Sequence, residues 1–456
     1  MRRAFRDGAA SQSAINTLQR AVAVGAVLGS MALVVVDAGM VTVALPSIGE
    51  SLGVTPAVSL RVVVAYQTAL LIALLPTAAL AERVGYRRVF SVGLLWFVAC
   101  AFLGAFAPSL GWLIAIRFVQ GLGGAAIMAL GIAILRQALP ASSVGAAIGW
   151  NAITVAVGSA AGPMIGAFVI SHSEWRWIFL THLPLGLLAL VATRALPAIP
   201  GAKLALDLPG MALSAGGFAS LILGADALAH RPDLASLLFA AGACSFWLLI
   251  RRGMTRSPVF PIDLLRIRPF RLSVMASVCC FIGQSTGMLA LPFYLQQTLH
   301  QAPIVTGYYL ALWPSSVAGA AVVSSHLCSS IPSHKLGLAG GSILALGLAG
   351  LAGLPTDASP LWVVVLTIFC GAGFGLFQVP NNKALFLAAP VARAAAAGGM
   401  QGTARLSGQT IGAVFMTLLF VWFPISHAPR WGLVIGAAFA LGAGLILMLS
   451  NPSANS

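Results

Sequence analysis

One aspartate and one arginine sit inside long apolar runs, where charged side chains are costly and are therefore functional candidates. Asp37 lies within VVVDAGMVTVALP, residues 34–46, and Arg117 lies within LIAIRFVQGLGGAAIMALG, residues 113–131. A carboxylate beside a guanidinium keeps its charge, whereas an isolated carboxylate in apolar surroundings favours its protonated form. A pair that separates and re-forms would bind and release a proton. The alternative is a structural ion pair that only fixes helix register.

Helix geometry places these two charges at similar depth. At about 1.5 Å per residue, Asp37 lies roughly 13 Å below an outer end at Pro46, and Arg117 roughly 8 Å below one near Trp112. Arg117 is the only arginine expected inside a span, so it is the expected partner of Asp37. Asp226, the other candidate acid, is expected at the membrane interface.

A second charged cluster lies in the short connection ALAERVGYRRVF, residues 79–90. An acid at one helix end that pairs with arginines at the start of the next would hold that face of the protein closed. The alternative is an ordinary basic loop. The expected gate residues, which surround a tight turn at the glycine, are Glu82, Arg83, Gly85, Arg87 and Arg88.

Small residues mark two of the apolar runs as sites of close helix packing. The run that holds Arg117 continues into GLGG, residues 121–124. The next run contains GSAAGPMIGAF, residues 158–168, in which a glycine recurs every fourth position on one helix face and a proline bends the helix. Its motif residues are Gly158, Gly162, Pro163 and Gly166.

The elements that position these residues are membrane helices. The chain is 59% apolar and 8% charged, with a mean hydropathy of +0.97, whereas about 25% of the residues of a soluble protein are charged. Runs of about 20 apolar residues can cross the hydrocarbon core, and backbone in lipid must be helical. The expected spans are about 21–46, 60–81, 88–108, 110–137, 144–170, 177–196, 207–229, 232–250, 270–298, 302–326, 336–354, 360–386, 397–424 and 430–449.

The order of these spans predicts two six-helix bundles with a helix pair between them. Such bundles in transporters face each other around a midplane site and rock to expose it alternately. The expected segments are a cytoplasmic arm (1–20), the first bundle (21–200), two inserted helices (201–250), a basic linker (251–269), the second bundle (270–449) and a tail (450–456).

The placement of the net charge of +15 predicts the orientation of the chain. With the first residue inside, nineteen lysines and arginines fall on the cytoplasmic side and four on the other. This bias follows the positive-inside rule and places both termini in the cytoplasm. We therefore expect the basic residues to orient the protein in lipid, and we expect no nucleic acid as a partner.

The motifs, taken together and in order, resemble those of the major facilitator superfamily. ALAERVGYRRVF is similar to its loop signature, RFVQGLGGA to its fourth-helix motif and GSAAGPMIGA to its fifth-helix antiporter motif. DAGMVTVALP, EWRWIFLTHLPLG and AGGMQGTARLSGQTIGA resemble motifs of the fourteen-helix drug–proton antiporter branch, the EmrB/QacA-like group. The chain departs from these patterns at Ala78, Glu82 and Tyr86 of the loop, at Gly39 and Thr42 of the first helix, and at His182 of the sixth.

This resemblance implies an all-α integral membrane transporter that exports hydrophobic or amphipathic compounds in exchange for protons and uses no cofactor. It links the first-helix aspartate and the fourth-helix arginine, here Asp37 and Arg117, to proton antiport. The polar groups lost from the first helix put the usual substrate preference in doubt. The family and the composition, rich in alanine, arginine and glycine, suggest the inner membrane of a bacterium. A membrane-fusion adaptor is a further partner known to this branch.

Polar and aromatic side chains should line the central cavity. Because Asp37 is the only acid placed to meet a cation, a lipophilic monocation or a neutral compound is the expected substrate, held by aromatic faces. The candidates for the cavity are Tyr66, Gln67, Trp150, Asn151, Gln284, Tyr294, Trp313 and Gln378.

Other function classes fit the sequence less well. An exporter of one specific metabolite is the nearest alternative, and a non-transporting membrane sensor is a remote one without an output domain in the sequence. The sequence has no metal cluster of His and Cys and no GxxxxGK[ST] phosphate loop, which argues against a membrane enzyme and against ATP-driven export.

Overall fold

The computed structural model describes residues 17–139, 141–197, 207–228, 231–253, 262–356, 358–390 and 393–450. Every regular element among these residues is helical, and fourteen helices are long and apolar enough to cross a membrane. The all-α membrane fold and the number of spans expected from the apolar runs are thus confirmed. Parts of the expected arm, inserted segment, linker and tail lie outside the described residues, namely 1–16, 198–206, 254–261 and 451–456.

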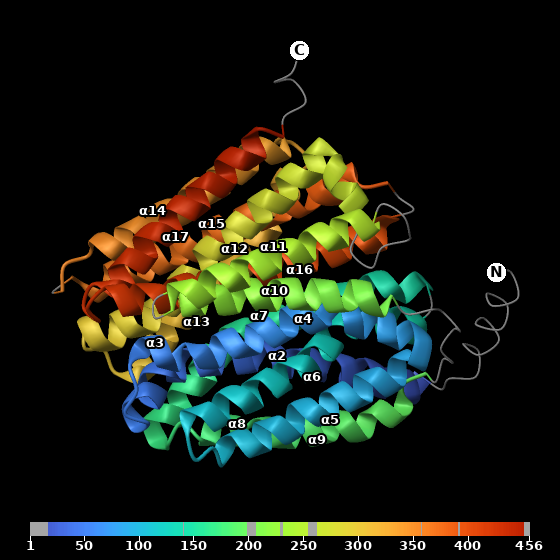
Figure 1. Cartoon of the computed structure of the whole chain (residues 1–456), viewed down its shortest axis with the longest axis horizontal. Helices are drawn as coiled ribbons and strands as arrows, with labels where there is room; N and C mark the ends of the chain where they lie inside the picture. The colour runs from blue at the N-terminus through green and yellow to red at the C-terminus, as the bar shows by residue number, and fades with distance from the viewer. Residues whose placement is uncertain are drawn as a thin grey trace, which may run out of the picture.

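The first six spans form one bundle, drawn from blue to green in Figure 1. Within it, α2 packs against α7 and α9, and α6 packs against α4 and α5. The segments α8, α9 and η1 together make the sixth span. The elements are α2 (Thr17–Ser51), α3 (Pro56–Ser59), α4 (Arg61–Val84), α5 (Tyr86–Ala105), α6 (Leu110–Ala138), α7 (Ala141–His172), α8 (Trp177–Leu180), α9 (His182–Ala192) and η1 (Thr193–Ala195).

The last six spans form the second bundle, drawn from yellow to red in Figure 1. Here α12 packs against α16 and α17, and α14 packs against α15 and α17. The elements are η2 (Ile262–Arg266), α12 (Arg268–Phe293), η3 (Tyr294–Thr298), α13 (Pro303–Leu327), α14 (Ser333–Gly353), α15 (Pro360–Ala388), α16 (Ala394–Trp422) and α17 (Ala428–Met448).

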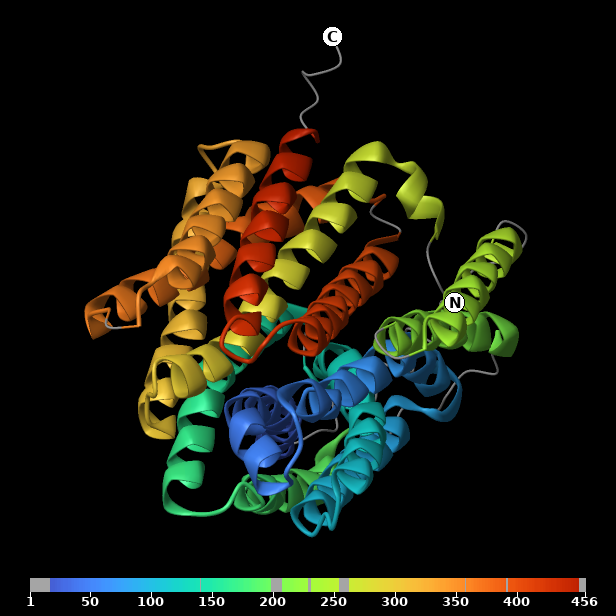
Figure 2. The ribbon, with the colours of Figure 1, turned by 60° about the vertical axis from the view of Figure 1, so that its left-hand side comes forward.

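The two bundles meet along two seams. One seam is the long contact of α7 with α13, and the other is the contact of α4 with α16. The inserted helices, α10 (Leu208–Ala227) and α11 (Pro232–Gly253), lie beside the second seam. Helix α10 contacts both α4 and α16, whereas α11 packs mainly on α10, and Figure 2 shows the pair at one side of the molecule.

The first span is longer than the sequence predicted. We expected it to end near Pro46, but α2 continues through this proline to Ser51. A proline removes only one helical hydrogen bond, and membrane helices tolerate this loss when neighbours satisfy the freed group. The expected end of this span is therefore corrected, and fourteen residues separate Asp37 from the end of α2.

The glycine face of α7 packs directly on the helix that carries Asp37. A Cβ atom added to Gly162 would lie 2.8 Å from the carbonyl oxygen of Val36, and one added to Gly166 would lie 2.8 Å from the Cα of Met40. From the other side, a Cβ at Gly39 would lie 2.7 Å from the Cδ of Pro163. The glycine at position 39 is thus explained by helix packing, because a larger side chain would separate α2 from α7.

A glycine-to-alanine substitution should therefore have opposite effects at two positions of α2. Gly39→Ala is expected to destabilise the protein by about 1–3 kcal/mol through overpacking against Pro163. Gly25→Ala is the matched control: a Cβ there meets nothing within 4 Å, and alanine favours the helix. Thermal unfolding of both variants in detergent measures the difference. Equal melting temperatures would show that α2 and α7 accommodate the added methyl group without a loss of stability.

Candidate functional site

A buried ion pair joins the two bundle helices α2 and α6. The Nη1 atom of Arg117 donates to Oδ2 of Asp37 at 2.7 Å and to Oδ1 at 2.9 Å. The side chain of Asp37 is fully buried and that of Arg117 is 1% exposed. The structure thus brings together the two charges that the sequence singled out.

Glycines of α6 bring α4 and α5 close to the helix that carries Arg117. A Cβ at Gly121 would lie 2.5 Å from the carbonyl oxygen of Tyr66 on α4, and one at Gly123 would lie 2.5 Å from the carbonyl oxygen of Gly93 on α5. As a result, the Arg117 guanidinium stacks over the Tyr66 ring at 4.2 Å from its centroid. Tyr66, a predicted cavity residue, is therefore buried against the ion pair.

Two further buried side chains complete the cluster around the carboxylate. Gln120, one helical turn after Arg117, accepts a hydrogen bond from Nη1 of Arg117 at 2.8 Å, and its amide nitrogen lies 3.4 Å from Oδ1 of Asp37. His182 of α9 places Nε2 at 3.4 Å from the same oxygen. We define these five residues, Tyr66, Gln120, His182, Asp37 and Arg117, as the charge cluster.

The two ring nitrogens of His182 have different partners. Nδ1 lies 3.0 Å from the carbonyl oxygen of Ile178 and 3.3 Å from that of Phe179. Because carbonyl oxygens only accept hydrogen bonds, Nδ1 carries a proton. Nε2 has no hydrogen-bond partner other than the nearby carboxylate. One more proton placed between His182 and Asp37 would therefore satisfy both groups.

The sequence identified only part of this cluster. Gln120 stands three residues after Arg117, so its place on the same helix face was a usable signal. His182 stood out only as a departure from the resembled motif, and nothing in the sequence places α9 beside α2. Arg117 was also expected to be the only arginine inside a span, which was wrong. Arg405 lies within α16. The polar residues on either side of it are of the kind usually found at the end of a membrane helix.

The predicted gate loop has the expected turn but not the expected pairing. Gly85 has a φ of +107°, which favours glycine, and it separates α4 from α5 without any longer connection. Glu82 and Arg88 are exposed. Among the residues described, no ion pair joins Glu82 to Arg83, Arg87 or Arg88.

The remaining cavity candidates fall into two groups. Tyr294 and Trp313 are buried inside the second bundle, where the Tyr294 hydroxyl donates to the carbonyl oxygen of Leu354 and the Trp313 ring lies beside Gly287. In this structure neither lines an open surface, because both pack between helices. Trp150 is exposed, and partly exposed polar side chains are found at Gln67, Asn151, Gln284 and Gln378.

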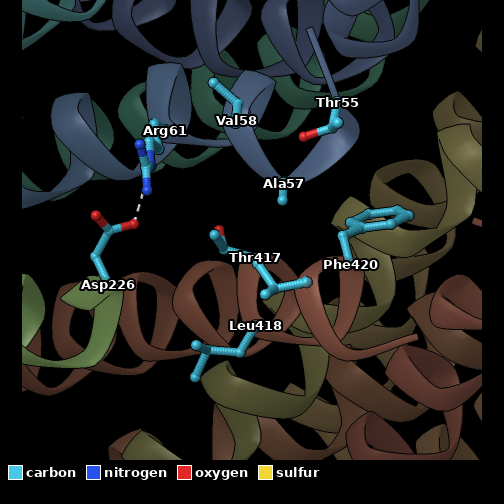
Figure 3. A pocket seen from close by; sticks show the side chains of 9 residues that line it. Thr55, Ala57, Val58, Arg61, Asp226, Thr417, Leu418 and Phe420 are labelled. Atoms are coloured by element: carbon cyan, nitrogen blue, oxygen red, sulfur yellow. Dashed lines mark hydrogen bonds and ion pairs between the residues drawn. The ribbon is translucent and has the colours of Figure 1, made fainter. Parts of the chain in front are cut away.

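Asp226 takes part in a separate ion pair at the second seam. Its Oδ1 accepts a hydrogen bond from Nε of Arg61 at 3.0 Å, and both side chains are about one third exposed. The pair borders a cavity of about 240 Å³ where α4, α10 and α16 meet. Figure 3 shows Arg61 and Asp226 at one end, with Thr417 and Phe420 of α16 facing Ala57 of α3. This pair attaches the inserted helices to the first bundle and does not contact the charge cluster.

Comparisons with known proteins agree with this architecture. The Major Facilitator Superfamily model matches residues 27–413. The chain is 38% identical to the uncharacterized transporter YebQ of Escherichia coli, over 89% of this chain and 90% of that one. It is 26% identical to the riboflavin transporter RibZ of Clostridioides difficile, over 84% of each chain. It is 30% identical to the multidrug resistance protein Stp of Mycobacterium tuberculosis, over 87% of this chain and 75% of that one.

A solved structure shares the fold at low sequence identity. A POT family transporter in complex with a thioalcohol-conjugated peptide superposes with a TM-score of 0.73. The alignment covers 95% of this chain and 96% of that one at 17% identity. The arrangement of the two bundles is therefore common to transporters with very different sequences.

The stability of the charge cluster can be tested by removing one or both charges. Arg117→Gln leaves the Asp37 carboxylate buried without its main partner and should cost about 3–5 kcal/mol. The double variant Asp37→Asn/Arg117→Gln should lose less, because it leaves neither charge unpaired. Thermal unfolding of the purified variants measures both effects. Additive losses in the double variant would contradict direct coupling of the two side chains.

Proposed function

The chain belongs to the Major Facilitator Superfamily, and from this premise we propose that it is a proton-coupled exporter of hydrophobic or amphipathic compounds. The observation that carries the proposal is the fully buried Asp37–Arg117 pair on two helices of the first bundle. It is a transport protein and not an enzyme, and the proposed driving force is the proton gradient.

The proposed coupling follows from the electrostatics of the charge cluster. While Arg117 holds Asp37, the carboxylate stays charged and the two helices stay together. Protonation of Asp37 removes the attraction, and Arg117 is then free to move with α6. A change of bundle orientation that exposes Asp37 to the opposite side would allow the proton to leave, after which the pair re-forms. Each cycle would carry one proton inward and substrate outward.

His182 gives this cycle a second group that can hold the proton. A neutral His182 directs the lone pair of Nε2 toward Asp37, so a proton on the carboxylate could form a hydrogen bond to that nitrogen. In the resembled motif this position is an asparagine, whose amide could instead donate to the charged carboxylate. We propose that the histidine favours proton uptake by Asp37.

The relatives support export without fixing the substrate. One is named for multidrug resistance, which favours a broad range of amphipathic compounds. Another is named as a riboflavin transporter, and this favours the second candidate function, the transport of one specific metabolite. The fourteen apolar helices and the bacterial relatives indicate a multi-pass inner-membrane protein. We further propose, from the distribution of arginines, that both termini face the cytoplasm.

Transport by inverted membrane vesicles tests the coupling. Wild-type vesicles with an imposed proton gradient should accumulate one or more members of a panel of amphipathic dyes and drugs. Asp37→Asn at matched expression should abolish the gradient-dependent part of this uptake. Asp226→Asn is the matched control, because Asp226 is also paired with an arginine but lies at the seam. Gradient-driven uptake that persists in Asp37→Asn would place the coupling proton elsewhere.

The role of His182 predicts a change in pH dependence. His182→Asn should still couple uptake to protons, but its amide would favour the charged form of Asp37. The dependence of uptake on pH should therefore differ from that of the wild type. Initial uptake rates from about pH 5 to 9 measure the profile. An unchanged profile would limit His182 to a packing role.

A further inference from the structure

Arg405 is a second arginine at membrane depth, and the charge cluster does not use it. It is the twelfth residue of α16 (Ala394–Trp422), roughly 16 Å along the helix from its start. Its side chain is partly exposed, and the Nε atom is buried without a hydrogen-bond partner. Among the residues described, Arg405 makes no ion pair.

The position of Arg405 on α16 places it at the seam between the bundles. Just before it, a Cβ at Gly402 would lie 3.4 Å from the side chain of Leu74 on α4 of the first bundle. Just after it, a Cβ at Gly408 would lie 2.6 Å from Phe281 on α12 of the second. Arg405 thus stands between a contact with one bundle and a contact with the other, and the substrate sites of such transporters lie at the interface of the two halves.

Among the described residues, no acid lies in an ion pair with Arg405 or remains inside a span to neutralise its charge. The chain contains only ten acidic residues. Five are paired with other arginines in the structure, namely Asp37, Glu174, Asp207, Asp226 and Asp263. Three more lie at or near helix ends, namely Glu50, Glu82 and Asp233. The last two, Asp7 and Asp357, lie outside the described residues and outside every apolar span of the sequence.

A guanidinium within a membrane span is costly without a counter-charge, and a ligand that supplies the counter-charge recovers that cost on binding. We propose that Arg405 binds the anionic group of an amphipathic organic substrate, a carboxylate, phenolate, sulfonate or phosphate. The planar guanidinium can donate two parallel hydrogen bonds to such a group. The aromatic and apolar remainder of the substrate would lie along the seam.

This inference rests on the proposed export function and narrows its substrate class. The scarcity of acids led us to expect a lipophilic monocation or a neutral compound. Arg405 repels a cation and attracts an anion. Because so few acids are present to cancel its charge, an organic anion is now the favoured substrate. Export of an anion is also assisted by a membrane potential that is negative inside.

A pair of dyes with a common ring system tests the proposal. Fluorescein is anionic at neutral pH and rhodamine 6G is cationic, and both contain the xanthene ring. Binding to the full chain in lipid nanodiscs is measured by fluorescence polarisation, with empty nanodiscs as the blank. The variants are Arg405→Gln and Arg405→Lys. Arg393→Gln is the matched control, because Arg393 precedes the same helix but pairs with Asp263 on an exposed surface.

The expected result separates charge from structure. Wild type and Arg393→Gln should bind fluorescein more tightly than rhodamine 6G. Arg405→Gln should weaken fluorescein binding about tenfold or more, the usual effect of losing a charge-assisted hydrogen bond, and should leave rhodamine 6G binding unchanged or stronger. Arg405→Lys should keep part of the affinity for fluorescein, because it keeps the charge without the planar fork.

Three results would overturn the proposal. The first is equal fluorescein affinity in wild type and Arg405→Gln. The second is an equal loss of both dyes in a variant with a wild-type melting temperature. The third is a wild-type protein that binds rhodamine 6G more tightly than fluorescein. A wild-type protein that binds neither dye, and whose melting temperature is not raised by the amphipathic acids deoxycholate and salicylate, would count as the same result. Dye binding does not require a proton gradient. A failure of the binding proposal is therefore distinct from a failure of proton coupling, which is measured only by uptake into vesicles that carry Asp37→Asn.

Discussion

A charge inside a membrane must be neutralised by a partner, because the hydrocarbon core offers no water to solvate it. This constraint explains the most prominent features of the interior. Asp37 is held by Arg117, supported by Gln120 and His182, and the arginine also rests on the ring of Tyr66. The proposed coupling uses this ion pair, which is required while Asp37 is charged and would be released when Asp37 binds a proton. Arg405 forms no ion pair among the described residues, and the proposed partner is the anionic group of a substrate.

Glycines allow the helices of the first bundle to pack closely, and this packing sets the distance between the charged side chains. The carboxylate is on α2 and the guanidinium is on α6, and the glycines of α6 and α7 remove side chains that would keep their neighbours apart. Small residues are the usual means of bringing membrane helices together, since lipid gives little hydrophobic drive for association. The glycine motifs therefore serve the site indirectly, by fixing the spacing of the helices that carry the charges.

The inserted helices α10 and α11 cover only one of the two contacts between the bundles. They lie along the α4–α16 seam, and α10 is tied to the first bundle by the Arg61–Asp226 pair. The opposite seam, between α7 and α13, has no such cover among the described residues. The two seams are therefore not equivalent, and movement of α4 against α16 must accommodate α10. Since Arg405 belongs to α16, the helix pair also borders the seam proposed to hold substrate.

The sequence alone determined the class of the protein, its fourteen spans and the identity of the buried ion pair. These follow from the length of apolar runs and from the rarity of charge within them, which are local properties of the chain. The sequence did not determine the exact ends of the spans, because a proline such as Pro46 can either end a helix or lie within it. Only the tertiary structure placed His182 beside Asp37 and buried Tyr294 and Trp313 between helices. It also showed that Glu82 forms no ion pair with the arginines of the gate loop in the part of the chain that the structure describes. These outcomes depend on how helices from distant parts of the chain rotate and pack, and apolar patterning carries little information about rotation when every face is apolar.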